Sequence, residues 1–341
     1  MLKPFIAKAI NRTDLTSEEA EEAMNVIMTG QATQAQIGAY LVALRMKGES
    51  IAEITGSVRA MRANAVKVKL NTSESLYDIV GTGGDGAHTF NISTAAAFVL
   101  AGTGRKVAKH GNRAASSHCG SADVLSALGV SLDLTPEQIA QAIEQVGIGF
   151  MFAAKFHPAM KHAIGPRKEI GQRTIFNILG PLTNPAGANI QLTGVFSPDL
   201  TEPLAHVLNE LGSKAALVIH GANGLDELNT TGINRVSHLK DGTVNTYELN
   251  PSELGLVPST VQDLRGGTPD EAAAMMRDLL GNKLNGARRD TVLLNTAGAL
   301  AAETGDFKSA LEEAMESLDS GKALARMNAL VEFSQSFQTI S

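Results

Sequence analysis

The amino-acid sequence predicts an α/β protein in which a small N-terminal all-helical domain precedes a larger domain built on a central, mostly parallel sheet. The first seventy or so residues show apolar residues at helical spacing and no strand pattern. From about Leu76 onwards, short apolar runs alternate with helical patterns. Alternating strands and helices are typical of domains with a parallel sheet. We therefore expect a helical domain at 1–72 and an α/β domain at 73–341.

The N-terminal part is interpreted as helices because capping signals precede apolar residues spaced three and four positions apart. Thr16 with Glu19 resembles a capping box, and Gly30 ends the helix that follows. Thr33 with Gln36 marks a second start, and a third helix begins near Ser50. Short loops between these helices predict a compact unit, which we expect helices near 165–185 to complete.

The second of these helices has a wider apolar surface than one core requires. Val42 and Ala43 lie outside its main apolar face. Burial against a second subunit explains this width, and so does a contact with the other domain. The first explanation predicts a homodimer formed through the N-terminal helices.

The α/β part is predicted from four apolar runs and the helical patterns between them. The expected strands are Leu76–Val80, Lys106–Ala108, Gln191–Phe196 and Ala216–His220. The expected helices are Thr94–Ala101, Ser121–Leu128, Pro136–Val146 and Pro203–Leu211. Further on, Asp241-Gly242 between two candidate strands within 236–249 predicts a hairpin. Helices at about 269–280 and 290–303 then precede a C-terminal helix.

Composition excludes several classes of protein. The net charge of −6 argues against a general nucleic-acid binder, which usually carries a basic excess. The single cysteine, Cys119, cannot form an intrachain disulfide, which is consistent with a reducing compartment. The start of the chain lacks a signal-peptide core, and no apolar run is long enough to span a membrane. We therefore expect a cytoplasmic protein.

A glycine-rich loop follows the first predicted strand, in the stretch DIVGTGGDGAHTFNIST at 78–94. Its glycines let a ligand approach the backbone, and the freed N–H groups at a helix start form an anion-binding nest. Gly81, Gly83 and Gly86 match a dinucleotide fingerprint, but that fold needs an acidic residue about 20 positions further on. The window 86–122 holds no acidic residue and four basic ones. The loop therefore predicts a site for a small, highly anionic ligand.

Two further motifs follow predicted strands, at the same edge of the sheet. KHGNRAASS at 109–117 supplies Lys109 and Arg113 for phosphates, with Asn112 as a neutral hydrogen-bonding group. LDEL at 225–228 supplies Asp226 and Glu227, hard oxygen ligands suited to Mg²⁺. An acidic pair alone is weak evidence, but beside a polyphosphate site it indicates the metal that neutralises the phosphates.

Together with GSADVLSALG and RTIFNILGPLTNP, these motifs resemble the anthranilate phosphoribosyltransferase family over essentially the whole chain. The resemblance implies a nucleoside phosphorylase-like fold. It also implies transfer of the phosphoribosyl group of 5-phosphoribosyl 1-pyrophosphate to the amine of anthranilate, in tryptophan biosynthesis. The partners it implies are these two small molecules, with neither nucleic acid nor membrane, and the cofactor is Mg²⁺, two ions in each active site.

The resemblance also assigns roles to residues. Those implied to contact phosphoribosyl pyrophosphate are Gly81, Gly84, Asp85, Thr89, Asn91, Ile92, Ser93, Thr94, Lys109, His110, Gly111, Asn112, Arg113, Ala114, Ala115, Ser116, Ser117 and Ser121. Asn112 and Arg167 would hold anthranilate, in a channel lined by His110 and His157. Ser93, Asp226 and Glu227 would bind the metal ions. Lys109, Asn112 and Arg167 are the expected catalytic residues, and His118 and Cys119 receive no role.

The expected reaction expels pyrophosphate through an oxocarbenium-like state, because an aromatic amine is a weak nucleophile. Charge neutralisation and positioning then matter more than a strong base, and the sequence shows no obvious side-chain base. Two alternatives are a pyrimidine nucleoside phosphorylase and a nucleic-acid-binding relative without activity. The first would not need the acidic pair, and the net charge argues against the second.

Overall fold

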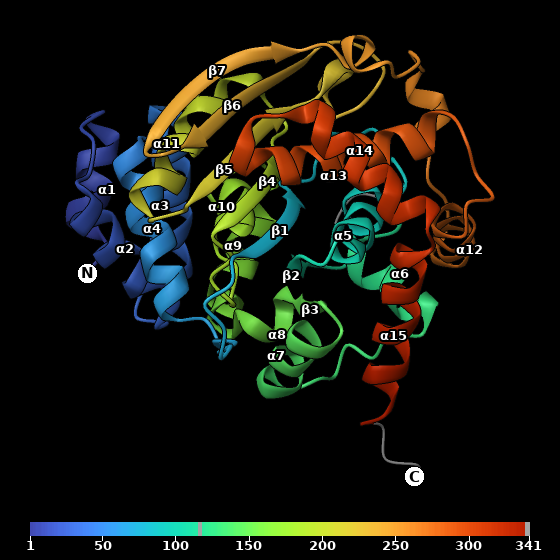
Figure 1. Cartoon of the computed structure of the whole chain (residues 1–341). Helices are drawn as coiled ribbons and strands as arrows, with labels where there is room; N and C mark the ends of the chain where they lie inside the picture. Colours follow the sequence, from blue (N-terminus) through green and yellow to red (C-terminus); the bar gives the residue numbers. More distant parts are fainter. Residues whose placement is uncertain (115–117, 338–341) are drawn as a thin grey trace.

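The computed structural model describes residues 1–114 and 118–337 of the chain. Its N-terminal part is helical, as the sequence predicts (Figure 1). The expected capping box at Thr16 is confirmed, and the expected helix starts at Thr33 and near Ser50 also carry capping boxes. A helix that the sequence analysis did not identify precedes them. The helices are α1 (Lys3–Ile10), α2 (Ser17–Met28), α3 (Gln34–Lys47) and α4 (Ile51–Ala63).

The strands of the described residues form one seven-stranded sheet in the order β3-β2-β1-β4-β5-β6-β7. The first five in this order run parallel, and β6 and β7 run antiparallel at one edge. The sequence analysis did not predict β3, although a short apolar run after a glycine is typical of a strand. The strands are β1 (Leu76–Gly81), β2 (Lys106–Gly111), β3 (Ile148–Phe152), β4 (Ile190–Gly194), β5 (Ala215–His220), β6 (Asn234–Lys240) and β7 (Thr243–Leu249).

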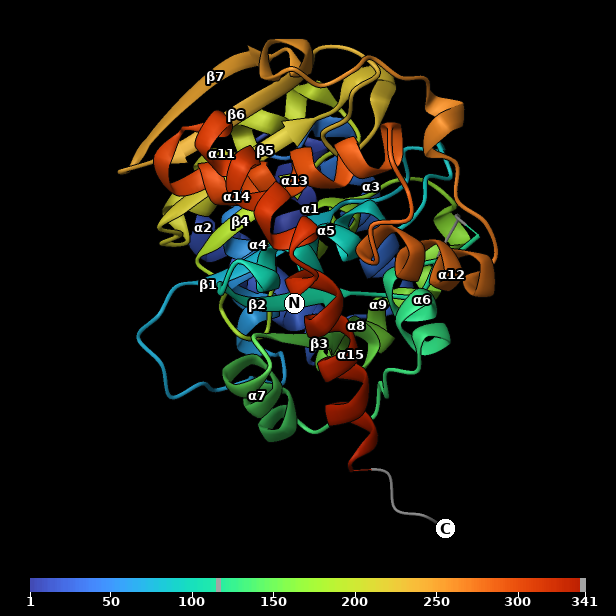
Figure 2. The ribbon, with the colours of Figure 1, turned by 45° about the vertical axis from the view of Figure 1, so that its right-hand side comes forward.

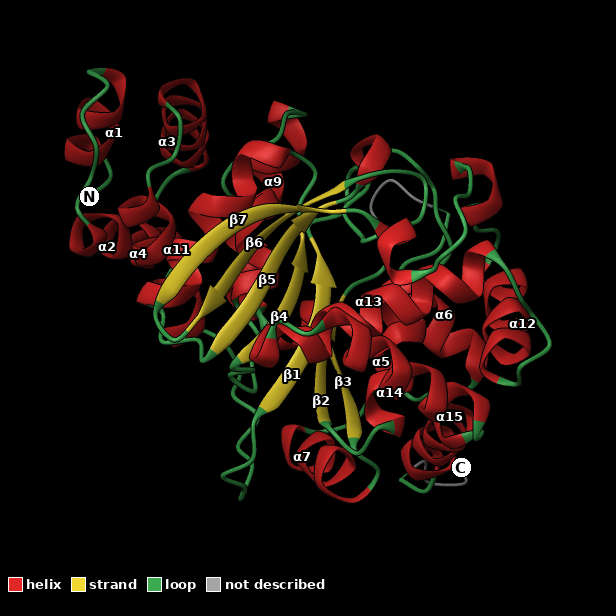
Figure 3. Cartoon of the chain, turned by 45° about the horizontal axis from the view of Figure 1, so that its top comes forward, coloured by secondary structure: helices red, strands yellow, loops and turns green. Residues whose placement is uncertain are grey.

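Helices cover both faces of this sheet (Figure 3). Strand residues alternate between the two faces: in β5, Leu217 packs in the core with α5 and α13, whereas Val218 packs in the core with the N-terminal helices and α11. The helices of this part are α5 (Ile92–Gly102), α6 (Ser121–Leu128), α7 (Pro136–Gln145), α8 (Ala153–Phe156), α9 (Lys161–Ile170), α10 (Phe176–Leu179), α11 (Thr201–Glu210), α12 (Pro269–Leu280), α13 (Ala287–Thr304), α14 (Phe307–Asp319) and α15 (Lys322–Gln335).

The antiparallel end of the sheet confirms the predicted hairpin. Asp241 and Gly242 join β6 to β7 with φ values of 49° and 74°, as a two-residue hairpin turn with positive φ at both positions requires. Figure 2 shows this hairpin at the top of the molecule and α7 at the bottom, near β3 at the opposite end of the sheet. The expected single C-terminal helix is wrong: the chain turns at Ser320 and Gly321, which separates α14 from α15.

Two short helices from the middle of the chain pack on the N-terminal helices. The helix α9 contacts α3 and α2, and α10 contacts α4. We propose that residues 1–72 form the N-terminal domain and that α9 and α10 complete it. The remaining residues of 73–341 then form the second domain. None of the described helices is long and apolar enough to cross a membrane.

Candidate active site

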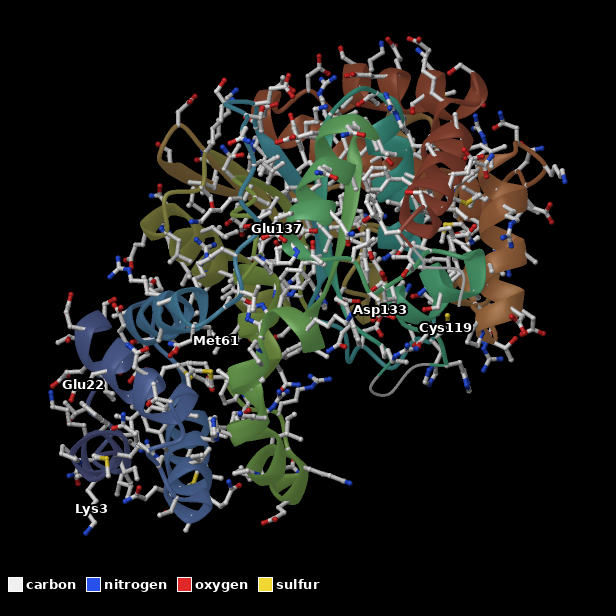
Figure 4. The ribbon with its side chains drawn as sticks, turned by 90° about the horizontal axis from the view of Figure 1, so that it is seen from below. Lys3, Glu22, Met61, Cys119, Asp133 and Glu137 are labelled. Carbon is white, nitrogen blue, oxygen red and sulfur yellow. The ribbon has the colours of Figure 1, made fainter. Side chains whose placement is uncertain are left out.

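A cavity of about 630 Å³ lies where the parallel strands β1, β2 and β3 end. This is the edge at which open α/β sheets bind ligands. Both parts of the chain line it: Met61 belongs to α4, and Cys119 precedes α6, and both are labelled in Figure 4. The segment between β5 and β6 adds Asp226 and Glu227. The motifs that the sequence analysis placed at one sheet edge are therefore brought together.

The glycine loop forms the wall of the cavity beside β1. Gly83, Gly84 and Gly86 have φ values of 66°, 77° and 75°, a left-handed backbone that favours glycine. The Gly83 N–H donates to Asp226 Oδ2 at 2.6 Å, which ties the loop to the acidic pair. Arg173 donates to the Gly84 carbonyl from the other side and stacks on Phe196. The sequence analysis did not identify Arg173, since neither contact is visible from local pattern.

Gly81 differs from the loop glycines because it is required for space and not for a left-handed backbone. Its φ is not positive, but a Cβ at this position would lie 2.2 Å from Asp226 Oδ2. Gly194, at the end of the neighbouring strand β4, would place a Cβ 1.5 Å from the Asp226 carbonyl oxygen. The two glycines make room for Asp226 between β1 and β4.

We expect Gly81→Ala to reduce turnover by about 100-fold, because it would displace the Asp226 carboxylate, which the sequence analysis expects to bind the metal. Steady-state kinetics measures the loss, and circular dichroism checks that the fold persists. Gly38→Ala is the control, since a Cβ there meets nothing within 4 Å. Equal activity of the two variants would show that Asp226 tolerates displacement.

Three carboxylates converge at the floor of the loop. Asp85, Asp226 and Glu227 each offer an oxygen within 4.8 Å of the others. Burial and the neighbouring Asp85 raise the pKa of Asp226 to about 6. Burial, together with Asp226 and Asp85, raises the pKa of Glu227 well above its usual value. Asp85 Oδ2 and Glu227 Oε2 are buried without a hydrogen-bond donor among the described residues. Such a set is unfavourable unless a cation neutralises it, so these residues fit a divalent metal.

Lys109 places a positive charge close enough to the cluster to oppose the raised pKa of Glu227. Its side chain is 2% exposed, and Nζ donates to the Ile79 carbonyl at 2.7 Å and to Ser93 Oγ at 3.3 Å. Burial lowers the pKa of Lys109 to about 8, and the charges of Asp78 and Glu227 oppose that shift. The ammonium is therefore held beside the start of α5, where the sequence analysis expects the phosphates.

The rest of KHGNRAASS is positioned by the start of α6. Ser121 Oγ donates to the Asn112 carbonyl at 3.2 Å. Arg113, expected to bind phosphate, is exposed and forms an ion pair with Asp123 at 2.7 Å. Ala114 lines the cavity, and its N–H donates to the same Asp123 side chain. Three expected ligands, Ala115, Ser116 and Ser117, lie outside the described residues.

The opposite side of the cavity is less charged. Arg167 of α9 stacks on Phe176 at 5.1 Å, and burial lowers its pKa without any described carboxylate offsetting that effect. The rings of His110 and His157 lie 5.1 Å apart. Burial lowers the pKa of His110 to about 3 and that of His157 to about 4, so both rings are neutral near pH 7. One cavity thus holds a guanidinium and two neutral imidazoles, a combination that suits an aromatic carboxylate.

Most of the other expected residues line the cavity, with one exception. Ile92 is fully buried in the core as the first residue of α5, and its N–H donates to the Phe90 carbonyl. Ile92 does not line the cavity, and its side chain packs in the hydrophobic core instead. The expected residues that line the cavity are Gly81, Gly84, Asp85, Thr89, Asn91, Ser93, Thr94, Lys109, His110, Gly111, Asn112, Arg113, Ala114, Ser121, His157, Arg167, Asp226 and Glu227.

Comparison with known proteins agrees with this architecture. Residues 73–324 match the α/β domain of a glycosyl transferase family, and residues 3–65 match the helical bundle domain of such a family. The chain is 52% identical to anthranilate phosphoribosyltransferase of Moorella thermoacetica, over 99% of both chains.

Two solved structures are similar to nearly the whole chain. One is anthranilate phosphoribosyltransferase from Thermus thermophilus, with a TM-score of 0.92 and 45% identity, covering 97% of this chain and 99% of that one. The other is the Saccharomyces cerevisiae protein in complex with PRPP and Mg, with a TM-score of 0.90 and 28% identity, covering 98% of both chains. These matches cover nearly the whole chain, from the helical bundle through the α/β domain. The chain thus belongs to the anthranilate phosphoribosyltransferase family of glycosyl transferases.

Proposed function

We propose that this chain transfers the phosphoribosyl group of 5-phosphoribosyl 1-pyrophosphate to the amine of anthranilate, giving N-(5-phosphoribosyl)anthranilate and pyrophosphate. One observation carries the proposal: a single cavity joins a glycine loop, a buried ammonium and three carboxylates to a less charged side that holds Arg167. The first side suits a diphosphate with its metal, and the second suits an aromatic acid. The yeast relative was solved with PRPP and Mg and also with 4-fluoroanthranilate.

The residues of the first side would act on the leaving group. In the reaction the C1–O bond breaks with its electron pair going to pyrophosphate, the amine lone pair forms the N–C1 bond, and the nitrogen then loses a proton. The Lys109 ammonium and the N–H groups of the glycine loop would stabilise the charge on the departing oxygens. Preorganised donors of this kind, in a site from which water is excluded, are typically worth about 3–4 kcal/mol each.

Asp226 and Glu227, with Asp85 beside them, would hold Mg²⁺ at this side, and we propose two ions, with Ser93 contributing to one of them. Bound Mg²⁺ would neutralise negative charge on the diphosphate. The role of Asp85 extends the expectation from sequence, which assigns this residue to the substrate alone.

On the second side, Arg167 would orient anthranilate through its carboxylate or its ring. Arg167→Ala is expected to raise the KM for anthranilate by about 100-fold and to change kcat less, because a charge-assisted contact is lost in both the ground and transition states. Steady-state kinetics with each substrate varied in turn measures the split. Lys168→Ala, the exposed neighbour on α9, is the control. An effect confined to phosphoribosyl pyrophosphate would contradict this role.

The N-terminal helices carry an exposed apolar surface suited to a second copy of the chain. Ile10 of α1 and Met46 of α3 are 66% and 76% exposed, and Val42 of α3 is 40% exposed. Since α1 and α3 pack together, these residues lie on adjacent helices. We propose a homodimer through this surface, and light scattering of the purified chain tests it.

Loss of anthranilate fluorescence that requires both phosphoribosyl pyrophosphate and Mg²⁺ tests the proposed reaction. Phosphorolysis of thymidine without that activity would instead favour a nucleoside phosphorylase. Salt-sensitive DNA binding without turnover would favour a nucleic-acid-binding protein. The three carboxylates within 4.8 Å of one another speak against both alternatives, because neither needs a buried metal cluster.

A further inference from the structure

The strands β1 and β2 pair over fewer residues with each other than β1 pairs with β4 or β2 pairs with β3. These two strands pair only at Leu76 with Lys106 and at Tyr77 with Val107. On its other side β1 pairs with β4 through to Gly81, and β2 pairs with β3 through to Gly111. The neighbouring strands β1 and β2 therefore separate after Tyr77, toward the edge at which the cavity lies.

A buried polar pair occupies the gap. Asp78 Oδ1 accepts a hydrogen bond from the His110 N–H at 3.3 Å, and Asp78 Oδ2 accepts one from Asn184 Nδ2 at 2.8 Å. Asn184 Nδ2 also donates to the Ala108 carbonyl at 2.7 Å. Asp78 is fully buried and Asn184 is 2% exposed. Backbone groups of β2 that no longer reach β1 are thus paired with two side chains instead.

Lys109, a residue of β2, pairs in turn with a backbone group of β1. Its Nζ donates to the Ile79 carbonyl, so a side chain of β2 satisfies the backbone of β1 across the gap. The Asp78 carboxylate is close enough to influence the Lys109 ammonium, and two buried opposite charges tolerate burial better than either alone. Neither Asp78 nor Asn184 lines the cavity, whereas Lys109 and His110 do.

We infer that Asp78 and Asn184 are positioning residues, which hold β1 and β2 apart and set Lys109 and His110 toward the two substrates. The inference rests on the proposed function. It gives a role to Asn184 in the GPLTNP segment and to Asp78 before the glycine loop, two residues that do not contact the cavity.

A reciprocal exchange tests the pair. Asp78→Asn turns an amide N–H toward the Asn184 amide or the His110 N–H, and Asn184→Asp sets a carboxylate against Asp78. Each single variant should lose about 100-fold in kcat/KM for phosphoribosyl pyrophosphate, the size expected when a reacting geometry shifts by about 1 Å. In the double variant the donor and acceptor of this pair are exchanged while the Ala108 carbonyl stays unpaired, so only about 10-fold of that loss should return. Recovery of this kind is a coupling that independent residues do not show.

Asn189→Ala is the matched control. Asn189 Oδ1 accepts the Leu76 N–H at 2.9 Å, so this variant removes an amide-to-backbone bond from the opposite end of β1. It should lower the melting temperature while leaving kcat/KM within about twofold of the wild type. Equal loss of kcat/KM in the control, or losses in the double variant that simply multiply, would overturn the inference.

Asn184→Ala provides a second test of the inference if Asp78→Asn does not fold. It leaves the carboxylate in place and should reduce kcat/KM by about 10-fold, a loss that Asn189→Ala does not show although both variants lower the melting temperature. Unchanged kinetics in Asn184→Ala would refute the positioning role. Failure of the proposed function would look different, because the wild-type chain itself would then consume no anthranilate.

Discussion

Asp226→Asn combined with Glu227→Gln is expected to reduce turnover by about 1000-fold or more at saturating substrates. Both changes keep the size of the side chain and remove its charge, so the N–H of Gly83 still meets an acceptor oxygen. What is lost is the ability to hold a divalent cation beside the diphosphate. Removing one preorganised electrostatic contact typically costs about 100- to 1000-fold, and two ligands are removed here. Turnover as a function of Mg²⁺ concentration measures the effect.

The same variant should be at least as stable as the wild type when no metal is present. The pKa of Asp226 in the fold is about 6, above the ordinary value of about 3.9, so the folded chain binds the extra proton between these values. The metal-free wild type therefore loses stability as pH rises from about 4 to about 6, and the variant lacks this contribution. Because protons compete with the cation, Mg²⁺ should also bind the wild type more weakly below about pH 6.

Asp270→Asn with Glu271→Gln is the matched control, since it changes the same dipeptide at the start of α12, away from the cavity. The amide at position 271 can still complete the capping box with Thr268. Wild-type turnover in the Asp226 and Glu227 variant, or an Mg²⁺ dependence like that of the control, would refute the metal assignment.

Lys109→Met should abolish measurable binding of phosphoribosyl pyrophosphate, with a loss of affinity of at least about 100-fold. Methionine preserves the length of the buried stem but removes the ammonium that meets Ser93 Oγ and the Ile79 carbonyl. A charge-assisted contact to phosphate is lost, and Asp78 is left buried without the opposite charge. Isothermal titration calorimetry measures the affinity, and thermal denaturation measures the cost to the fold.

Lys106→Met serves as the control for this variant. Lys106 begins the same strand, and its Nζ donates to the Glu144 carbonyl at 2.7 Å, at the edge of the sheet opposite the cavity. The control should bind substrate like the wild type. Unchanged binding in Lys109→Met would show that the glycine loop and the metal suffice for the diphosphate.

Features that depend on neighbouring residues were predictable from the sequence. Thr16 and Glu19 lie within one helical turn, so their capping box follows from spacing alone. The turn at Asp241 and Gly242 is equally local, because its positive φ values depend on those two residues. Parallel strands end at one edge of the sheet, so the chain order of apolar runs also indicated where the glycine loop, Lys109 and Asp226 meet.

The contacts between distant residues were beyond such reasoning. Asp85 joins Asp226 and Glu227 only because the segment after β5 folds back beside the loop after β1, and the strand order that brings them together is set by packing on both faces of the sheet. For the same reason, sequence placed Gly81 in a phosphate nest, whereas its missing Cβ makes room for Asp226.

By itself, the sequence determined most of the helices and four of the five parallel strands, the hairpin, the motifs at one sheet edge and the family they resemble, because each motif depends on spacing within a short segment. Only the tertiary structure decided that β1 and β2 separate after Tyr77 and that Asp78 and Asn184 fill the gap. These two residues lie 106 positions apart in the chain. Their pairing depends on which strands become neighbours, and burial in the completed core favours it because an unpaired buried polar group is costly.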